Sequence, residues 1–139
     1  MHTVSEMVKT NPQAPVMSRD ALIQCIEVCV LCEQTCSACA DACLGEDDLP
    51  ELRRCIRLNL DCADVCGTAV RMLSRQQSPE PSLLGGLLEL CATVCAMCAE
   101  ECSRHDHEHC AVCAEMCSRT EDECQQALAA LHRGYRGAD

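Results

Sequence analysis

The spacing of the cysteines is the feature that most constrains this chain. The longest run alternates steps of four and three residues: Cys25, Cys29, Cys32, Cys36, Cys39 and Cys43. Because an α-helix turns once in about 3.6 residues, this spacing places all six thiols on one helix face. Three further groups keep the rhythm, two of them with one gap: Cys55, Cys62 and Cys66; Cys91, Cys95, Cys98 and Cys102; Cys110, Cys113, Cys117 and Cys124. The sequence therefore predicts four helices, each with a thiol-lined face.

The composition shows what must fill the core of such a protein. The chain has 139 residues, enough for one domain, and 17 of them are cysteines. It has no Phe or Trp and only one Tyr. Free cysteine behaves as a small buried hydrophobe, so cysteine, alanine, leucine and valine can form the core together. We expect the fold to close without metal and to gain stability with it.

Helix boundaries follow from turn and capping residues. Gly45 stops the first helix, and Asp48, Pro50 and Glu51 resemble a capping box with proline in the first turn of the second. Asp106 can cap the fourth helix. The expected helices span about 18–44, 48–75, 83–104 and 106–132. Short links between four helices favour an all-α fold, an antiparallel up-down four-helix bundle.

Three segments are expected along the chain. The first carries Pro12 and Pro15 and reads as a tail, in which Thr3 to Lys9 can form a short helix that docks on the body. Gly134 and Gly137 predict a frayed end. The segments are 1–17 as the tail or docking helix, 18–133 as the metal-storage bundle, and 134–139 as the frayed C-terminus.

The charge and the N-terminal sequence narrow the partners and the compartment. A net charge of −11 argues against a nucleic-acid partner. The N-terminus has no apolar signal-peptide core, and we expect no segment long and apolar enough to span a membrane. The expected location is the reducing cytosol, where disulfides are rare. An odd number of cysteines also argues against a fully paired disulfide framework.

The two ends of the bundle differ in their side chains. In an up-down bundle the links that follow Leu44 and Arg104 lie at the same end, which we call the mouth. There, His105 and His109 join the thiols as candidate metal ligands, whereas His107 is expected to point outward. The opposite end has leucines on or near the cysteine seams: Leu22, Leu73, Leu84, Leu88, Leu128 and Leu131. We expect these leucines to form an apolar plug.

Two positions in the cysteine seams hold other residues. Asn59 stands between Cys55 and Cys62, and Thr120 stands between Cys117 and Cys124. Each could hydrogen-bond a thiolate or offer oxygen to a metal, or it could bond the neighbouring backbone. The backbone interpretation is favoured for Thr120, and both stay open for Asn59. Methionines in the tail have no regular spacing that would indicate a site.

The chemistry of the thiols indicates which metal they bind. Soft thiolates select Cu(I), Zn(II) or iron–sulfur clusters. A four-thiolate zinc site carries two net negative charges, whereas one Cu(I) per thiolate is neutral, so only the monovalent ion fills a buried thiol core without accumulating charge. The CxxC pairs lack the glycines of a zinc knuckle, and the ferredoxin cysteine run is absent. Multiple Cu(I) ions per chain are therefore expected. A zinc or iron–sulfur protein and a thiol redox sensor remain the alternatives.

The cysteine runs Cys25–Cys43 and Cys91–Cys102, with the histidine-bearing turn before Cys110, resemble the bacterial copper storage proteins over residues 18–133. The resemblance implies a Cys-lined four-helix bundle that holds many Cu(I) ions. No enzyme activity is expected, because the sequence shows no Ser–His–Asp set, phosphate-binding loop or open metal site with a general base. The absence of a signal sequence indicates the cytosolic branch, which implies a homotetramer. It also implies that the seam cysteines, His105 and His109 bind copper. A copper chaperone or a small-molecule thiol would be the exchange partner.

Overall fold

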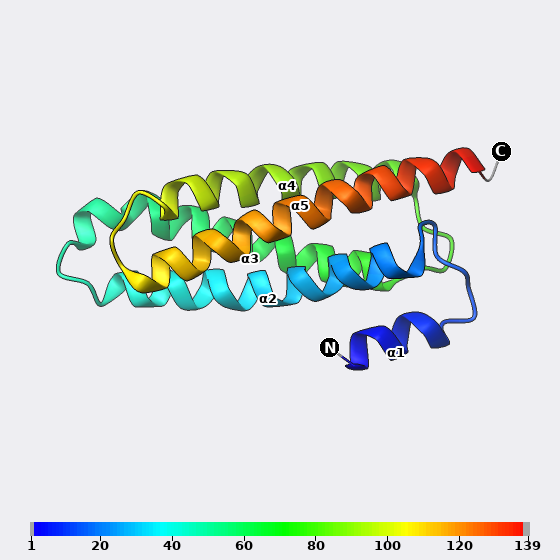
Figure 1. The fold of residues 1–139 in the computed structure, drawn as a ribbon, viewed down its shortest axis with the longest axis horizontal. Coiled ribbons are helices and arrows are strands. Elements are labelled where there is room, and N and C mark those ends of the chain that lie inside the picture. Colours follow the sequence, from blue (N-terminus) through cyan, green and yellow to red (C-terminus); the bar gives the residue numbers. More distant parts are fainter. Residues whose placement is uncertain (1, 138–139) are drawn as a thin grey trace.

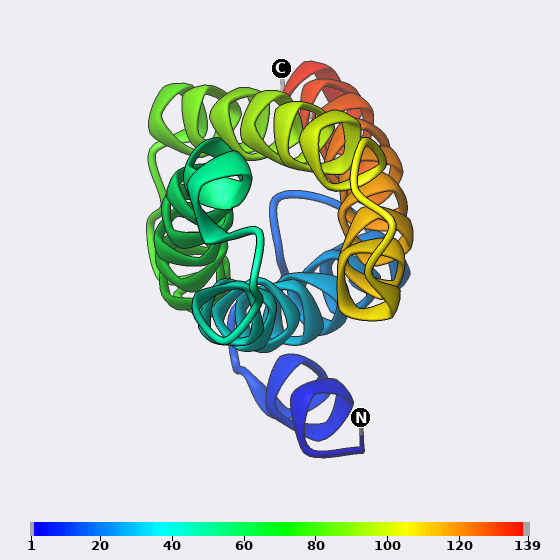
Figure 2. The ribbon, with the colours of Figure 1, turned by 90° about the vertical axis from the view of Figure 1, so that its left-hand side faces the viewer.

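The computed structural model describes residues 2–137, and these form an all-helical bundle with no strand in that range. Four long helices run antiparallel to their neighbours, with a short helix against the outside (Figure 1). Viewed end on, they form a ring in chain order, so that each long helix packs against two others (Figure 2). The elements are α1 His2–Thr10, α2 Arg19–Leu44, η1 Leu49–Leu52, α3 Arg53–Ser74, α4 Pro81–Cys102 and α5 Glu108–Gly137. The predicted fold class is confirmed.

Most helix ends lie close to the expected positions. The Ser18 hydroxyl accepts a hydrogen bond from the Ala21 amide at 3.2 Å, so it caps α2, and Gly45 ends that helix. Pro81 opens α4 two residues earlier than expected, as a proline in the first turn can, because it needs no amide partner there. The fourth helix begins at Glu108, where the His107 carbonyl accepts the Ala111 amide, rather than after a cap at Asp106.

The capping box expected at Asp48 does not form. Its side chain makes no cap hydrogen bond, and the segment Leu49–Leu52 is a 3-10 turn that leads into α3. The Asp48 carboxylate instead accepts a hydrogen bond from His107 Nε2 at 2.9 Å, across the mouth. A hydrogen-bonding partner from another loop has replaced the local backbone partner that the sequence pattern suggested.

The tail forms the short helix that we expected and closes over the leucine end. Val8 of α1 is buried against α2, and Met17 is buried where the tail enters the bundle. The Gln76 side chain accepts the Val16 amide at 3.2 Å and donates to the Leu73 carbonyl at 2.8 Å. These two hydrogen bonds tie the tail to the end of α3.

Gly134 lies where the N-terminal tail passes close to α5. The backbone of Val16 passes so close to α5 that a Cβ at position 134 would collide with its carbonyl oxygen. α5 runs to Gly137, beyond the expected end near His132, and residues 138 and 139 of the expected frayed segment lie outside the described residues. The proposed segment boundaries remain a prediction.

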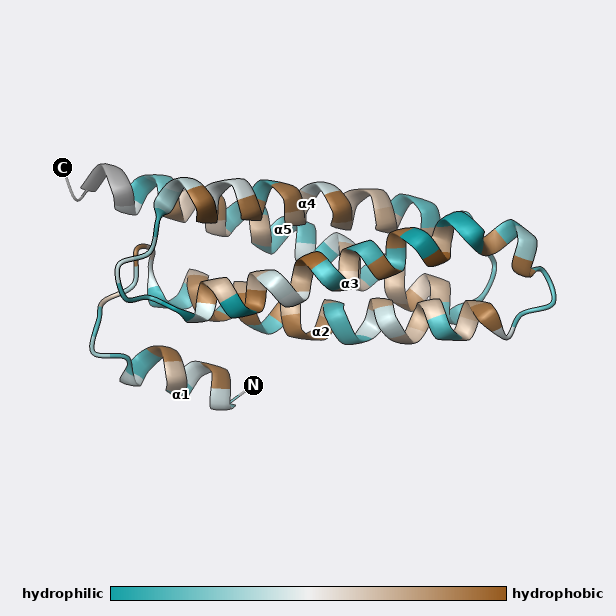
Figure 3. Cartoon of the chain, turned by 180° about the vertical axis from the view of Figure 1, so that it is seen from behind, coloured by the Kyte–Doolittle hydropathy of each residue, from teal (hydrophilic) through white to brown (hydrophobic). Residues whose placement is uncertain are grey.

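Two helices, α2 and α4, are long and apolar enough by length and composition to span a membrane. Our expectation that no segment would pass this test was wrong, because cysteine and alanine rank as apolar residues. Buried core helices of soluble proteins pass the same test, so two such helices are weak support for a membrane location. In Figure 3, hydrophobic and hydrophilic segments alternate along the helices, as in a bundle whose helices have one buried face.

The leucine plug forms at the end opposite the mouth. Leu22, Leu73 and Leu88 are fully buried in the core cluster, and Leu84 and Leu131 are nearly so. Leu128 is partly buried and packs against the same cluster. Apolar side chains thus seal this end of the thiol core from water.

We expect Leu88→Ala to lower the free energy of unfolding of the metal-free protein by about 3 kcal/mol, because it leaves a cavity in the plug. The matched control is Leu83→Ala on the same helix, where the leucine is 61% exposed and the expected change is below about 0.5 kcal/mol. Urea unfolding followed by circular dichroism measures both. Equal, small effects of the two variants would show that the plug contributes no stability.

Candidate metal centre

All 17 cysteines are free and buried. They come from α3, α4 and α5 as well as from the six-cysteine run of α2, and nearly all have no measurable exposure. The predicted inward orientation of the thiol faces is therefore confirmed. The interior of this bundle is a continuous set of sulfur atoms where an ordinary protein would have branched aliphatic and aromatic side chains.

The middle of the core contains a compact quartet from three helices: Cys32, Cys36, Cys62 and Cys117. The Sγ atom of Cys32 lies 3.8 Å from those of Cys36 and Cys62 and 3.9 Å from that of Cys117. The Sγ atoms of Cys36 and Cys117 are 3.5 Å apart. These distances are well beyond the roughly 2 Å of a disulfide bond and leave each sulfur able to share an ion with its neighbours.

Neighbouring quartets share members with this one. Two further groups have all their sulfur atoms within 4.8 Å of one another: Cys32, Cys62, Cys66 and Cys95, and Cys36, Cys98, Cys113 and Cys117. Cys32 contacts both Cys62 of α3 and Cys117 of α5. Sulfur atoms one turn apart on the same helix also lie 3.8 to 3.9 Å from each other, so the quartets join into one network.

The network extends to the leucine plug. Cys66 and Cys91 place their sulfur atoms 3.8 Å apart, which joins α3 to α4. Beyond them, Cys25, Cys29 and Cys124 form a trio within 4.8 Å. The sulfur path therefore runs the length of the bundle.

Asn59 is fully buried among thiols. Its Nδ2 donates to Cys55 Sγ at 3.5 Å, and its Oδ1 accepts from Cys98 and Cys113 at 3.1 and 3.0 Å. The structure thus resolves the question that the sequence left open, because this side chain bonds cysteines and not the backbone. It joins α3 to α4 and α5 at the level just inside the mouth.

Thr120 has the local role that the sequence favoured. Its hydroxyl donates to the Met116 carbonyl at 2.8 Å, one turn earlier in α5. With its proton donated to the backbone, this hydroxyl fills a seam position without linking the helices.

His109 is the histidine that reaches the thiol network. Its Nδ1 lies 3.4 Å from Cys39 Sγ and 3.6 Å from Cys110 Sγ, and with Cys43 these residues form a four-ligand group. Burial opposes protonation of this ring, but hydrogen bonds to Cys39 and to Glu46 outweigh it and raise the pKa of His109. The mouth therefore combines an imidazole nitrogen with three thiols.

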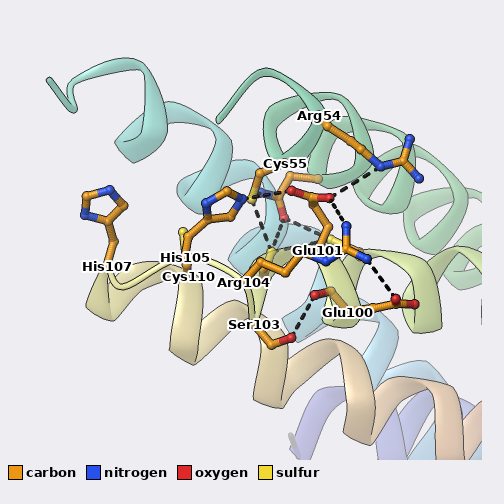
Figure 4. Close-up of polar contacts among 12 residues, drawn as sticks. Arg54, Cys55, Glu100, Glu101, Ser103, Arg104, His105, His107 and Cys110 are labelled. Atoms are coloured by element: carbon orange, nitrogen blue, oxygen red, sulfur yellow. Dashed lines mark hydrogen bonds and ion pairs between the residues drawn. The ribbon is translucent and has the colours of Figure 1, made fainter. Parts of the chain in front are cut away.

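His105 is held by a carboxylate that sequence reasoning missed. Its Nε2 lies 2.8 Å from Glu101 Oε2, and Glu101 is only 6% exposed (Figure 4). Arg54 and Arg104 lie 3.4 and 3.0 Å from the other oxygen of the same carboxylate. The sequence feature that could have indicated this contact is the position of Glu101, one helical turn before His105 and next to Cys102. A buried carboxylate with two arginine partners is fixed in place.

His107 does not point outward as expected. Its Nδ1 lies 2.9 Å from Glu46 Oε2 and its Nε2 lies 2.9 Å from Asp48 Oδ1. The ring also stacks on that of His109, with centroids 5.4 Å apart and planes 2° from parallel. His107 thus links the two loops of the mouth, which the sequence could not show because Glu46 and His107 are far apart in the chain.

Hydrogen bonding and burial shift the thiol pKa values in both directions. Hydrogen bonds from Cys117, Cys36 and Cys62 lower the pKa of Cys32, whereas hydrogen bonds with Cys113 and Cys117 that favour the protonated thiol raise the pKa of Cys36. Burial is the main cause that raises the pKa of Cys43 to about 12. At the plug, hydrogen bonds from Cys124 and Cys29 lower the pKa of Cys25 to about 5. Some thiols of the network are therefore easier to deprotonate than others.

The donor set determines what the core can bind. Closely spaced sulfur atoms from four helices, with one imidazole at the mouth, form a soft ligand set suited to Cu(I) or Zn(II). Among the residues that the structure describes, the buried carboxylate is that of Glu101, which lies at the mouth and not among the thiols of the interior. Magnesium and calcium, which require oxygen ligands, are therefore poor candidates.

Comparison with known proteins identifies the family. Residues 18–129 match the family model described as "Copper storage protein". The fold and this match show that the chain belongs to the copper storage protein family, as its cysteine runs predicted.

Solved structures of related proteins have the same bundle. The copper storage protein Ccsp of Streptomyces lividans, solved loaded with 10 copper equivalents, is 46% identical, with a TM-score of 0.88 over 91% of this chain and 98% of that one. The Cu(I)-bound copper storage protein BsCsp3 is 36% identical, with a TM-score of 0.67 over 73% of this chain and 92% of that one. The cysteine-rich protein YhjQ of Bacillus subtilis is 38% identical over 105 residues, which are 76% of this chain and 94% of YhjQ.

Proposed function

We propose that this protein stores Cu(I), several ions per chain, on the thiolates of its core. The observation that carries the proposal is the single connected network of buried, unbridged sulfur atoms. The proposed ligands are the thiolates of all 17 cysteines with His105 and His109. Likeness to copper-loaded Ccsp and BsCsp3 supports it. Anaerobic titration with Cu(I), which measures the number of ions bound per chain, tests this proposal.

Zinc is the rival that the quartets themselves suggest, since four thiolates bind Zn(II) tetrahedrally. Adjacent quartets share Cys32 and Cys62 on one side and Cys36 and Cys117 on the other, so they cannot be filled as independent four-thiolate sites. Each filled site would also place two negative charges in a dry interior, which is costly without counter-ions. Cu(I) bridged between thiolates avoids both problems.

The proposed location, oligomeric state and exchange partner of this protein are based on its relatives. A cytosolic location is supported by the description of one Streptomyces lividans relative as a cytosolic copper storage protein. The role is not enzymatic. A homotetramer is proposed from the resemblance to the family's cytosolic branch, and the exposed side chains of Leu31, Leu60 and Leu90 support association with other copies. A copper chaperone or a small-molecule thiol is proposed to exchange the ions.

Copper enters at the mouth in this proposal. His109 lies against Cys39 and Cys110, so an ion captured by its imidazole needs to move only a few ångströms to reach thiolates. Successive sulfur atoms less than 4 Å apart then allow transfer from one pair to the next. The leucine plug blocks the other end.

The double variant His105→Ala/His109→Ala should slow copper loading and leave the capacity almost unchanged. The imidazoles serve capture, whereas nearly all storage ligands are thiolates. Stopped-flow loading from a Cu(I) chelator measures the rate, and a chelator competition endpoint measures the capacity. His132→Ala, at an exposed position of α5, is the matched control. Unchanged kinetics in the double variant would remove the role of the histidines in uptake.

A further inference from the structure

His109 has partners on both of its ring nitrogens. Nδ1 faces Cys39 and Cys110, and Nε2 lies 2.8 Å from Glu46 Oε2. A carboxylate oxygen can only accept, so the Nε2 atom must carry the hydrogen. In the neutral ring the lone pair then belongs to Nδ1, the nitrogen that faces the thiols. The tautomer assigned by these contacts is the one that can bind a metal at the mouth.

The loop that follows α2 holds Glu46 in this position. The same Oε2 atom lies 2.9 Å from His107 Nδ1, and the other nitrogen of His107 lies 2.9 Å from Asp48. The stacked rings of His107 and His109 bring both imidazoles to one carboxylate oxygen. Glu46 is therefore restrained from two directions, and its half-buried side chain is 30% exposed.

His105 repeats the arrangement on the other side of the mouth. Its Nε2 also meets a carboxylate, that of Glu101, which Arg54 and Arg104 hold in place (Figure 4). His105, in the turn before α5, and His109, in its first turn, thus each present Nε2 to a glutamate from an earlier part of the chain.

We propose that Glu46 is a positioning residue for uptake of Cu(I), because it fixes the tautomer and the ring orientation of His109. This inference rests on the proposed role of His109 in copper capture. A carboxylate behind a metal-binding imidazole holds the ring and increases its basicity, and loss of such a partner typically lowers metal affinity or activity about 10- to 100-fold. Glu101 holds His105 by the same contact.

The first test reads the tautomer of the metal-free protein. Imidazole ¹⁵N shifts, recorded at about pH 8.5 where a histidine ring is mostly neutral, distinguish Nε2–H from Nδ1–H. We expect Nε2–H at His109 in the parent protein and a mixture of tautomers in Glu46→Ala. Glu46→Gln retains an acceptor oxygen and should restore the Nε2–H form. A ring that keeps the same tautomer in Glu46→Ala would overturn the inference.

The second test reads copper uptake in the same variants. Glu46→Ala should slow the initial phase of Cu(I) loading about tenfold, with the final capacity unchanged, and Glu46→Gln should recover most of the rate. Asp48→Ala is the control, because it removes a partner of His107 and leaves the contact between Glu46 and His109 intact. We expect its loading rate to match that of the parent.

The outcomes separate this inference from the proposed function. If His109→Ala loads slowly but Glu46→Ala loads normally, the positioning role is wrong and the uptake role of the histidine stands. If Asp48→Ala is as slow as Glu46→Ala, the order of the loop matters and the orientation of His109 does not. If His109→Ala itself loads at the parent rate, the proposed uptake role fails, and the tautomer measurement still tests what Glu46 does to the ring.

Discussion

Anaerobic titration of the reduced, metal-free protein with Cu(I) should continue to about one ion per cysteine, roughly 17 ions per chain. Each ion replaces one thiol proton, so the charge of the core stays near zero as it fills. The shared membership of the quartets allows every sulfur to bridge ions, which independent sites would not allow. Competition with a coloured Cu(I) chelator gives the stoichiometry directly.

Zinc and a single-cysteine variant provide the controls. Zn(II) should saturate at no more than about one ion per four cysteines and bind with much lower affinity per site in the crowded core. Cys36→Ala removes a thiol shared by two quartets, and it should lower the Cu(I) plateau by about one ion, because one thiolate neutralises one ion. A Cu(I) plateau near four ions, or tight zinc uptake to the same plateau, would contradict the storage proposal.

Copper loading should release protons and weaken as the pH falls. Burial raises the pKa of Cys43 to about 12, and hydrogen bonds raise the pKa of Cys36, so these thiols hold their protons at neutral pH and Cu(I) must displace them. For each proton released per ion, the apparent affinity falls about tenfold for each unit of decreasing pH. The apparent affinity must fall, and not rise, as the pH decreases, because protons and Cu(I) compete for the same sulfur lone pairs.

A pH-stat that counts protons during loading measures this effect. Chelator competition at several pH values between about 6 and 8 gives the slope of affinity against pH. Cys25 is the internal contrast, since hydrogen bonds from Cys124 and Cys29 lower its pKa, and ions that it binds should release fewer protons than ions bound by Cys36 or Cys43. An affinity that is independent of pH would mean that the core is already fully ionised without metal.

The local helix signals were reliable where they depended on neighbouring residues. α2 begins after Ser18 and ends at Gly45, as expected, because capping and helix termination depend on residues only a few positions apart. Asp48 shows where such reasoning fails. Its spacing from Glu51 satisfied a capping pattern, but His107 from another loop offered its carboxylate a partner across the mouth.

In the metal site as well, the sequence predicted some features and not others. The inward position of the cysteines followed from the α2 run and its repeats, since seventeen thiols at helical spacing have one consistent way to avoid water. The surroundings of the histidines did not follow. Glu46 is one of many acidic residues on an acidic chain, and nothing in the sequence marks it as a partner of His109. For Glu101, only its position one turn before His105 indicated the contact.

The amino-acid sequence by itself determined the helices, the soft ligand chemistry and the contrast between a leucine end and a histidine mouth. Periodicity and residue type act along a single helix and can be read without coordinates. Only the tertiary structure decided which sulfur atoms belong to the same quartet and which nitrogen of His109 faces the core. It also decided that Asn59 forms hydrogen bonds with thiols from three helices. These contacts depend on the stagger of the helices and the meeting of two loops, which distant parts of the chain set together.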